Sequence, residues 1–312
     1  MNNEQKPLLI ILGPTASGKT KLAVQVAHRL GGEIISADSR QVYRGMDIGT
    51  GKDLSEYVVD GQAVPYHLID LVDAGEDYNL HRYQQDFHRA VADIQSRGRV
   101  QVLCGGTGLY IEAVLKNHAY TAVPVNEPLR DELETLTEAE LLHRFTLQPS
   151  PFTPLADTST RKRLMRAIEI GAYLNANPGA VEQSSVPRYN YRIFGVDVPV
   201  DVRRQRITTR LHDRLTEGMV REVEDLIRNG VSPEKLVFYG LEYKFIVQYL
   251  TGELDYATMI ARLETAIHQF AKRQMTFFRK MERDGLTIEW LDGGESTQWM
   301  TEQIVDRYLI FT

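Results

Sequence analysis

An apolar run at residues 7–12 leads directly into a glycine-rich segment, and this junction constrains the fold more than any other feature of the chain. The segment reads G-P-T-A-S-G-K-T over residues 13–20 and matches the phosphate-loop pattern G-x-x-x-x-G-K-[ST]. The next stretch, residues 20–30, is amphipathic and is followed by Gly31, which is typical of a helix and its end. A strand, a glycine-rich loop and a helix in this order predict a site for phosphate or diphosphate.

The residues of this loop have distinct expected roles. Gly13 and Gly18 let the backbone approach an anion closely, and the N–H groups at the start of the helix point toward it. Lys19 adds a positive charge, and the Thr20 hydroxyl is a candidate Mg²⁺ ligand. A chance glycine-rich turn is the alternative, but the flanking patterns argue against it. The candidate diphosphate-binding residues are Gly13, Pro14, Thr15, Ala16, Ser17, Gly18, Lys19 and Thr20.

Composition limits the class of protein. A chain of 312 residues with 43 % hydrophobic and 25 % charged residues predicts a soluble globular protein of roughly two domains. The polar start of the chain and the lack of a long apolar stretch predict neither a secretory signal nor a membrane span. Cys104 is the single cysteine, which excludes an intramolecular disulfide and a multi-cysteine zinc site and fits a cytoplasmic location.

Strand and helix patterns alternate over the first third of the chain. Runs at 8–12, 33–37 and 100–104 are typical of strands, and residues 80–94 are typical of a helix that begins after Asn79. We expect an α/β fold, with a phosphate-loop-type parallel sheet and flanking helices. The expected domains are the core at 1–116, a mainly helical insertion at 117–190, and a return to the core with basic helices at 191–312.

Ligands of open parallel sheets bind at the carboxyl ends of the strands, so three loops should meet there. They are the phosphate loop, residues 38–43 and residues 105–108. Asp38 is a candidate general base, and a helix cap or a Mg²⁺ ligand are its alternative roles. Residues 105–107 are alternatively a strand-to-helix turn whose Thr107 caps the following helix, a role compatible with ligand contact.

Three basic clusters lie at 161–166, 203–214 and 272–283. Each cluster alone is more often a solvated, salt-bridged face. Three of them in a protein of formal net charge −6 favour a surface for a nucleic-acid backbone. On the helix that carries the last cluster, we expect Phe270, Phe277 and Phe278 to be buried anchors rather than platforms for base stacking.

Several segments together resemble the tRNA dimethylallyltransferase family, also called tRNA isopentenyltransferase. They are GPTASGKT at 13–20, DSRQVYRGMDIGT at 38–50, HLID at 67–70, GGTGLY at 105–110, RLMRAIE at 163–169 and AKRQMTFFRK at 271–280. The second segment is far more specific than a phosphate loop. The chain departs from the family's pattern at 49–64 and at Glu242, where a glycine is usual.

The resemblance implies transfer of a dimethylallyl group from dimethylallyl diphosphate to N6 of adenosine 37, next to the anticodon in tRNAs that read codons starting with U. The product is N6-dimethylallyladenosine, and diphosphate is released. Asp38 would act as the base, Thr107 would contact the reacting groups, Lys19 and Arg166 would lie near the diphosphate, and Gln41 would read the base.

The resemblance also implies the partners of the chain. Mg²⁺ bound at Thr20 is the implied cofactor, and the insertion would bind the anticodon stem-loop. We expect the protein to act as a monomer. The implied tRNA contacts are Asp38, Ser39, Arg40, Gln41, Thr107, Arg130, Arg163, Lys272, Arg273, Gln274 and Arg279. The residues leave open a phosphate-loop kinase of a small molecule, an enzyme that prenylates AMP, and an RNA-binding module with a vestigial phosphate loop.

Overall fold

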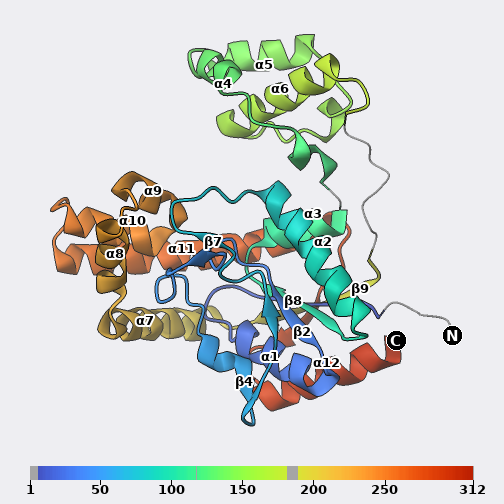
Figure 1. Ribbon diagram of the computed structural model, residues 1–312, viewed down its shortest axis with the longest axis vertical. Helices are drawn as coiled ribbons and strands as arrows, with labels where there is room; N and C mark the ends of the chain where they lie inside the picture. The colour runs from blue at the N-terminus through green and yellow to red at the C-terminus, as the bar shows by residue number, and fades with distance from the viewer. Residues whose placement is uncertain (1–5, 117, 181–188, 312) are drawn as a thin grey trace. The chain divides into compact units, whose positions relative to one another are not determined.

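A computed structural model describes residues 6–116, 118–180 and 189–311. The chain divides into two units (Figure 1). Unit 1 comprises Met1–Leu115 and Arg188–Thr312, and unit 2 comprises Lys116–Pro187. Residue 117, where the sequence predicts that the insertion begins, lies outside the described residues.

Unit 1 contains a parallel sheet in which six strands are described, in the order β10-β9-β1-β8-β2-β6. The predicted α/β class with a parallel sheet is therefore confirmed. The central strands β1, β8 and β2 carry the three loops that the sequence singles out. The bounds are β1 Leu8–Leu12, β2 Glu33–Ser36, β6 Tyr66–His67, β8 Gln101–Gly105, β9 Tyr191–Asp197 and β10 Glu289–Asp292.

Helices cover both faces of this sheet. Leu9 and Ile11 of β1 belong to a core with α1 (Lys19–Leu30) and α12 (Thr297–Phe311). The alternate side chains of β1 belong to a second core with α2, α3 and the C-terminal half of α11. Because both faces are buried, β1 is a continuous apolar run without alternation. The second set of helices is α2 Leu80–Ser96, α3 Gly108–Lys116 and α11 Tyr256–Arg283.

The helix predicted to begin after Asn79 does so. The Asn79 side chain accepts the N–H of Arg82, which caps α2. The helix ends at Ser96, and Gly98 follows with a φ of 66°, a left-handed conformation that suits glycine at a helix end.

The helices of the C-terminal part form a third core with the N-terminal half of α11. Val42, Met46 and Val72 join this core from the segments after β2, which fastens those segments between the sheet and the helices. Two small sheets lie in the same region, β3 (Tyr43–Arg44) with β7 (Val72–Asp73) and β4 (Val58–Val59) with β5 (Gln62–Ala63). The helices are α7 Val200–Glu217, α8 Met219–Arg228, α9 Pro233–Tyr239 and α10 Leu241–Leu250.

Unit 2 is helical over its described residues, with α4 (Glu127–Glu134), α5 (Glu138–Leu147) and α6 (Arg161–Ala176). Leu133, Leu141 and Leu164 belong to its core. In the described part of the whole chain, no helix has both the length and the apolar character needed to cross a bilayer.

Candidate active site

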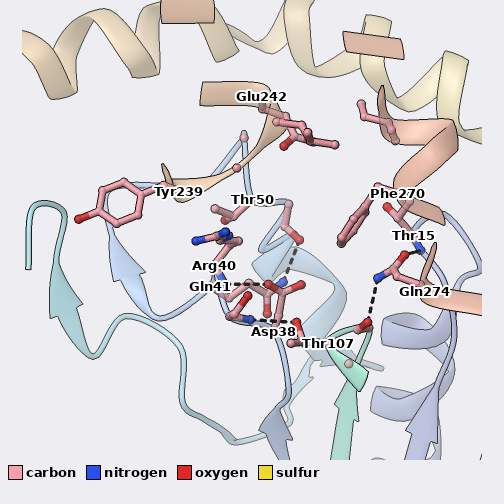
Figure 2. A pocket seen from close by; sticks show the side chains of 18 of the residues that line it. Thr15, Asp38, Arg40, Gln41, Thr50, Thr107, Tyr239, Glu242, Phe270 and Gln274 are labelled. Atoms are coloured by element: carbon pink, nitrogen blue, oxygen red, sulfur yellow. Dashed lines mark hydrogen bonds between the residues drawn. The ribbon is translucent and has the colours of Figure 1, made fainter. Parts of the chain in front are cut away.

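A cavity of about 550 Å³ lies at the carboxyl ends of β1, β8 and β2 (Figure 2). All three loops predicted to meet there line it, through Thr15 and Lys19, Asp38 and Gln41, and Thr107. Residues of α7, α10 and α11, of the end of α9 and of the segment at 49–57 also line it. Every residue that lines the cavity belongs to unit 1.

The phosphate loop turns sharply into α1. Gly18 has a φ of 83°, and a Cβ at Gly13 would lie 2.6 Å from Ser17 Oγ. The first N–H groups of α1 have no acceptor within the helix, so they are available to an anion. Lys19 donates to the carbonyl of Pro14 at 3.3 Å. Burial lowers the pKa of Lys19, although the nearby Asp38 carboxylate favours the charged ammonium.

The loops after β2 and β8 are joined beside Asp38. Its Oδ1 accepts the N–H of Arg40 at 2.9 Å, which holds the carboxylate at the cavity wall. Thr107 Oγ1 accepts the N–H of Ser39 at 3.2 Å, while the Thr107 N–H donates to the carbonyl of Ala37 at 3.1 Å. The Thr107 side chain therefore links two loops, and the Thr107 carbonyl begins α3 by accepting backbone N–H groups.

Gln41 is fastened at both ends of its amide. Its Oε1 accepts the hydroxyl proton of Ser36 at 2.9 Å, and its Nε2 donates to the carbonyl of Gly51 at 3.2 Å. Only 8 % of Gln41 is exposed, yet it lines the cavity. The amide is thus held in one orientation at the position where the resemblance implies base recognition.

Gln274, another implied tRNA contact, bonds to the backbone of two loops. Gln274 is buried on α11, its Oε1 accepts the N–H of Thr15 at 2.8 Å, and its Nε2 donates to the carbonyl of Gly106 at 2.9 Å. A Cβ at Gly106 would lie 2.4 Å from that Nε2. Gln274 therefore braces the phosphate loop against the loop after β8 from within the cavity wall.

The expectation for the aromatic residues of α11 is confirmed in one case and wrong in another. Phe278 is fully buried, as predicted. Phe270 is 39 % exposed and lines the cavity, because α11 passes there from one core to the other. Phe277 is half-buried and also lines the cavity. Among the basic residues of this helix, Lys272, Arg273 and Arg279 are exposed.

Three other candidates lie in unit 2. Arg166 donates to the carboxylate of Glu169 and, at 2.6 Å, to the carbonyl of Val123. Arg130 donates to both oxygens of Glu169, at 3.0 and 3.1 Å. Arg163 is exposed and pairs with Asp157 at 2.8 Å. The guanidinium of Arg166, which the resemblance implies to be near the diphosphate, is engaged in the packing of unit 2.

This arrangement predicts a structural effect of removing Arg166. Burial would raise the pKa of Glu169, but the Asn126 N–H and the two guanidinium groups hold it below its usual value. The stability that Glu169 gains from these partners is therefore fully present above its unfolded-state pKa. It is lost as the pH falls through the folded-state pKa of Glu169. We expect Arg166→Gln to lower the free energy of unfolding by about 1–2 kcal/mol at neutral pH, measured by thermal unfolding.

A matched control for this variant is Lys162→Gln, which changes an exposed residue of the same helix. Affinity for inorganic diphosphate should be the same in both variants. A loss of diphosphate affinity without a loss of stability in Arg166→Gln would contradict the structural role.

Sequence reasoning missed the cations on the α7 side of the cavity. Arg210 and Arg214 line it, although the sequence grouped them with a nucleic-acid surface. Arg210 pairs with Asp53, and Arg214 Nη2 lies 3.8 Å from the same carboxylate. Burial lowers the pKa of Arg214. The sequence did contain a signal for this position. Arg210 and Arg214 are four residues apart, so both side chains lie on one face of the helix, next to the buried Leu211.

Glu242 also lines the cavity and was noted in the sequence as a departure from the family's pattern. Burial raises the pKa of its carboxyl group, and the charge of Arg214 acts in the opposite direction. Glu242 and both arginines also line a small adjoining cavity beside Thr15 and Ala16. The phosphate loop is therefore flanked by charges of both signs.

The donor set of the cavity fits Mg²⁺ that is bound mainly by a phosphorylated ligand. Thr20, which carries a hydroxyl group, lines the cavity next to Lys19. Within the described ranges, no group of three or more His, Cys, Asp and Glu side chains could hold a metal by itself. Mg²⁺ commonly keeps several waters and binds through substrate phosphates with few protein ligands, so one hydroxyl is compatible with it.

A phosphate loop at the edge of a parallel sheet, with a carboxylate in the same cavity, defines an α/β protein of the phosphate-loop class. The sequence profile of the IPP transferase family matches residues 41–281, and that of the isopentenyl transferase family matches residues 6–70. The chain belongs to the tRNA dimethylallyltransferase family and is a prenyl-transferring enzyme.

Individual relatives match over nearly the whole chain. A tRNA dimethylallyltransferase of Porphyromonas gingivalis is 54 % identical over 288 residues, covering 91 % of this chain and 93 % of the relative. One of Phocaeicola vulgatus is 48 % identical over 303 residues, covering 97 % and 98 %. The crystal structure of a full-length tRNA isopentenylpyrophosphate transferase from Bacillus halodurans is 31 % identical, with a TM-score of 0.69 and coverage of 98 % and 95 %.

Proposed function

We propose that this enzyme transfers the dimethylallyl group of dimethylallyl diphosphate to N6 of adenosine 37 in tRNAs that read codons starting with U. The product is N6-dimethylallyladenosine, and the second product is diphosphate. The observation that carries the proposal is one cavity that joins an anion-binding loop to the Asp38 carboxylate and the oriented amide of Gln41. A base can reach such a cavity only when it is unstacked from its neighbours.

The reaction needs a proton acceptor on the adenosine side. N6 attacks C1 of the dimethylallyl group, the bond between C1 and the diphosphate oxygen breaks, and the electrons of that bond leave with diphosphate. The N6 proton passes to the carboxylate of Asp38, which the Arg40 N–H holds in place. The amide of Gln41 would read the adenine edge, and Thr107 would contact the reacting groups.

The leaving diphosphate gains negative charge as the bond breaks, so preorganised positive groups lower the barrier. Lys19 and the N–H groups of the phosphate loop would supply them on one side. On the other side, we assign to Arg210 the role that the resemblance gave to Arg166, because Arg210 lines the cavity. Mg²⁺ held by Thr20 and the diphosphate would neutralise further charge.

We propose that tRNA binds over the exposed basic residues of α11 and over unit 2, which would contact the anticodon stem-loop through groups such as Arg163. The reaction would take place in the cytoplasm, where tRNA is available. We propose that the protein acts as a monomer.

The proposal is tested by offering radiolabelled dimethylallyl diphosphate with unmodified tRNA, with AMP, and with competing ATP. We expect label in tRNA alone, and nuclease digestion should locate it on the adenosine next to the anticodon. ATP turnover without prenyl transfer would refute the proposal in favour of a kinase, and label in AMP would refute it in favour of a nucleotide prenyltransferase.

The salt dependence of tRNA affinity tests the surface on α11. Removing the charges of Lys272, Arg273 and Arg279 by alanine substitution should weaken binding. It should also reduce the slope of log Kd against log salt by roughly one unit for each phosphate group that is no longer neutralised. Binding is measured over a series of salt concentrations. Arg262→Ala, an exposed arginine near the start of the same helix, is the control. An unaltered slope in the triple variant would show that these residues are solvated and do not contact tRNA phosphates.

A further inference from the structure

The turn at residues 46–52 forms part of the cavity wall and is held by a carboxylate from a distant segment. Glu222, on α8, accepts three successive backbone N–H groups of this turn. Its Oε2 accepts from Asp47 at 2.8 Å and from Ile48 at 2.7 Å, and its Oε1 accepts from Gly49 at 3.0 Å. We infer that Glu222 is a positioning residue for the adenosine side of the cavity, an inference that rests on the proposed function.

The geometry of the turn explains why a carboxylate fits there. The carbonyl of Asp47 accepts the N–H groups of Gly51 at 2.9 Å and Lys52 at 3.1 Å, so the chain closes one helical turn. The first N–H groups of such a turn have no acceptor within it and carry partial positive charge. Glu222 satisfies them in the way that a capping side chain does, but from more than 170 residues away.

Tyr243 fastens the carboxylate of Glu222 in turn. Its hydroxyl donates to Glu222 Oε1 at 2.7 Å, and the side chain is almost fully buried. A Cβ at Gly49 would lie 2.7 Å from the Tyr243 ring, so the glycine allows the turn to lie directly on the ring. The carboxylate therefore accepts four hydrogen bonds and has little freedom to rotate.

The end of the turn is fastened independently by Lys52. Its ammonium is 1 % exposed and donates to the carbonyl of Tyr43 at 2.7 Å, to Asp47 Oδ1 at 2.5 Å and to Asp70. With Glu222 at the start and Lys52 at the end, the turn has little room to shift as a whole. Loss of Glu222 would unfasten the start of the turn, and the Asp47 carbonyl, which accepts the N–H of Gly51, could then shift and move Gly51 with it.

The fixed turn also holds the side chain of Gln41 in place. The carbonyl of Gly51 accepts the Gln41 amide, and Gly51 and Thr50 line the cavity near Asp38, as Figure 2 shows for Thr50. Glu222 does not line the cavity, so its effect on the reaction passes through the turn. A displaced turn would misplace the Gln41 amide, which is bonded to Gly51, more directly than the phosphate loop, although Gly51 also lies against the guanidinium groups of Arg210 and Arg214.

The test is Glu222→Gln, which keeps the size of the side chain but replaces an acceptor oxygen by a donor that opposes the N–H groups. We expect kcat/KM for tRNA to fall about 10- to 100-fold, as a small misplacement near the reacting groups does, with a clearly smaller change in KM for dimethylallyl diphosphate. Glu224→Gln, on the exposed face of the same helix, is the matched control and should behave as wild type. Tyr243→Phe removes a single hydrogen bond and gives a smaller loss of the same kind if Glu222→Gln does not fold.

A double-mutant cycle separates positioning from general destabilisation. If Glu222 acts through Gln41, adding Glu222→Gln to Gln41→Ala should cost little further activity. Additive losses, or an equal rise of both KM values, would overturn the inference. Wild-type kinetics in Glu222→Gln would overturn the inference about Glu222 and leave the proposed function intact. By contrast, absence of prenyl transfer to tRNA by the wild-type enzyme would refute the proposed function itself.

Discussion

Replacing Asp38 by asparagine should lower kcat for prenyl transfer by about 10²- to 10⁴-fold, the range that a general base contributes. The amide keeps the shape of the side chain and can still accept the N–H of Arg40, so the loop should keep its conformation. It cannot take the N6 proton. We therefore expect tRNA affinity to be retained and the single-turnover rate to fall. Rapid quench with labelled dimethylallyl diphosphate measures that rate.

The control for this variant is Asp60→Asn, at an exposed position outside the cavity. Asn tolerates the positive φ of 49° at residue 60, so the substitution should be neutral. Single-turnover rates of Asp38→Asn equal to those of wild type would exclude Asp38 as the base. The carboxylate would then be better explained by the alternative of a Mg²⁺ ligand or a structural cap.

The second large effect is expected on the diphosphate side, for Lys19→Met. Methionine fills most of the space of the lysine side chain but removes the charge next to the phosphate loop. Loss of one group that stabilises developing charge typically costs about 10²- to 10³-fold in kcat. We expect a loss of that size together with weaker binding of inorganic diphosphate, measured by calorimetry.

Lys21→Met is the matched control, because Lys21 is exposed on the same helix and does not line the cavity. The two variants should have similar thermal stability. Full activity and full diphosphate affinity in Lys19→Met would mean that the loop N–H groups and the arginines of α7 hold the diphosphate without Lys19.

The sequence was sufficient to predict the half of the site whose residues belong to local sequence patterns. The apolar runs, the phosphate loop and the cap at Asn79 are each encoded within a few residues, and parallel strands bring their loops to one edge by topology. These signals led to Lys19, Asp38 and Thr107 as residues of one cavity, and all three line it.

The other wall depends on packing between distant segments, which periodicity does not reveal. Arg210 and Arg214 have the spacing of any solvated basic stripe, and only the docking of α7 on α11 turns them inward. Phe270 and Phe278 look equivalent in sequence, but α11 passes from one core to another between them. Gln274 was grouped with its basic neighbours, although its own side chain bonds to backbone groups of the phosphate loop and of the loop after β8.

The hydrogen bond from Thr15 to Gln274 joins residues that are 259 positions apart, and it has a consequence for how the protein is made. During synthesis the phosphate loop leaves the ribosome well before the helix that braces it. Contacts of such long sequence separation form late in folding. A nascent chain that stops before α11 therefore holds a phosphate loop without its brace, and competence to bind substrate should arise abruptly when that helix docks, rather than growing in steps with chain length.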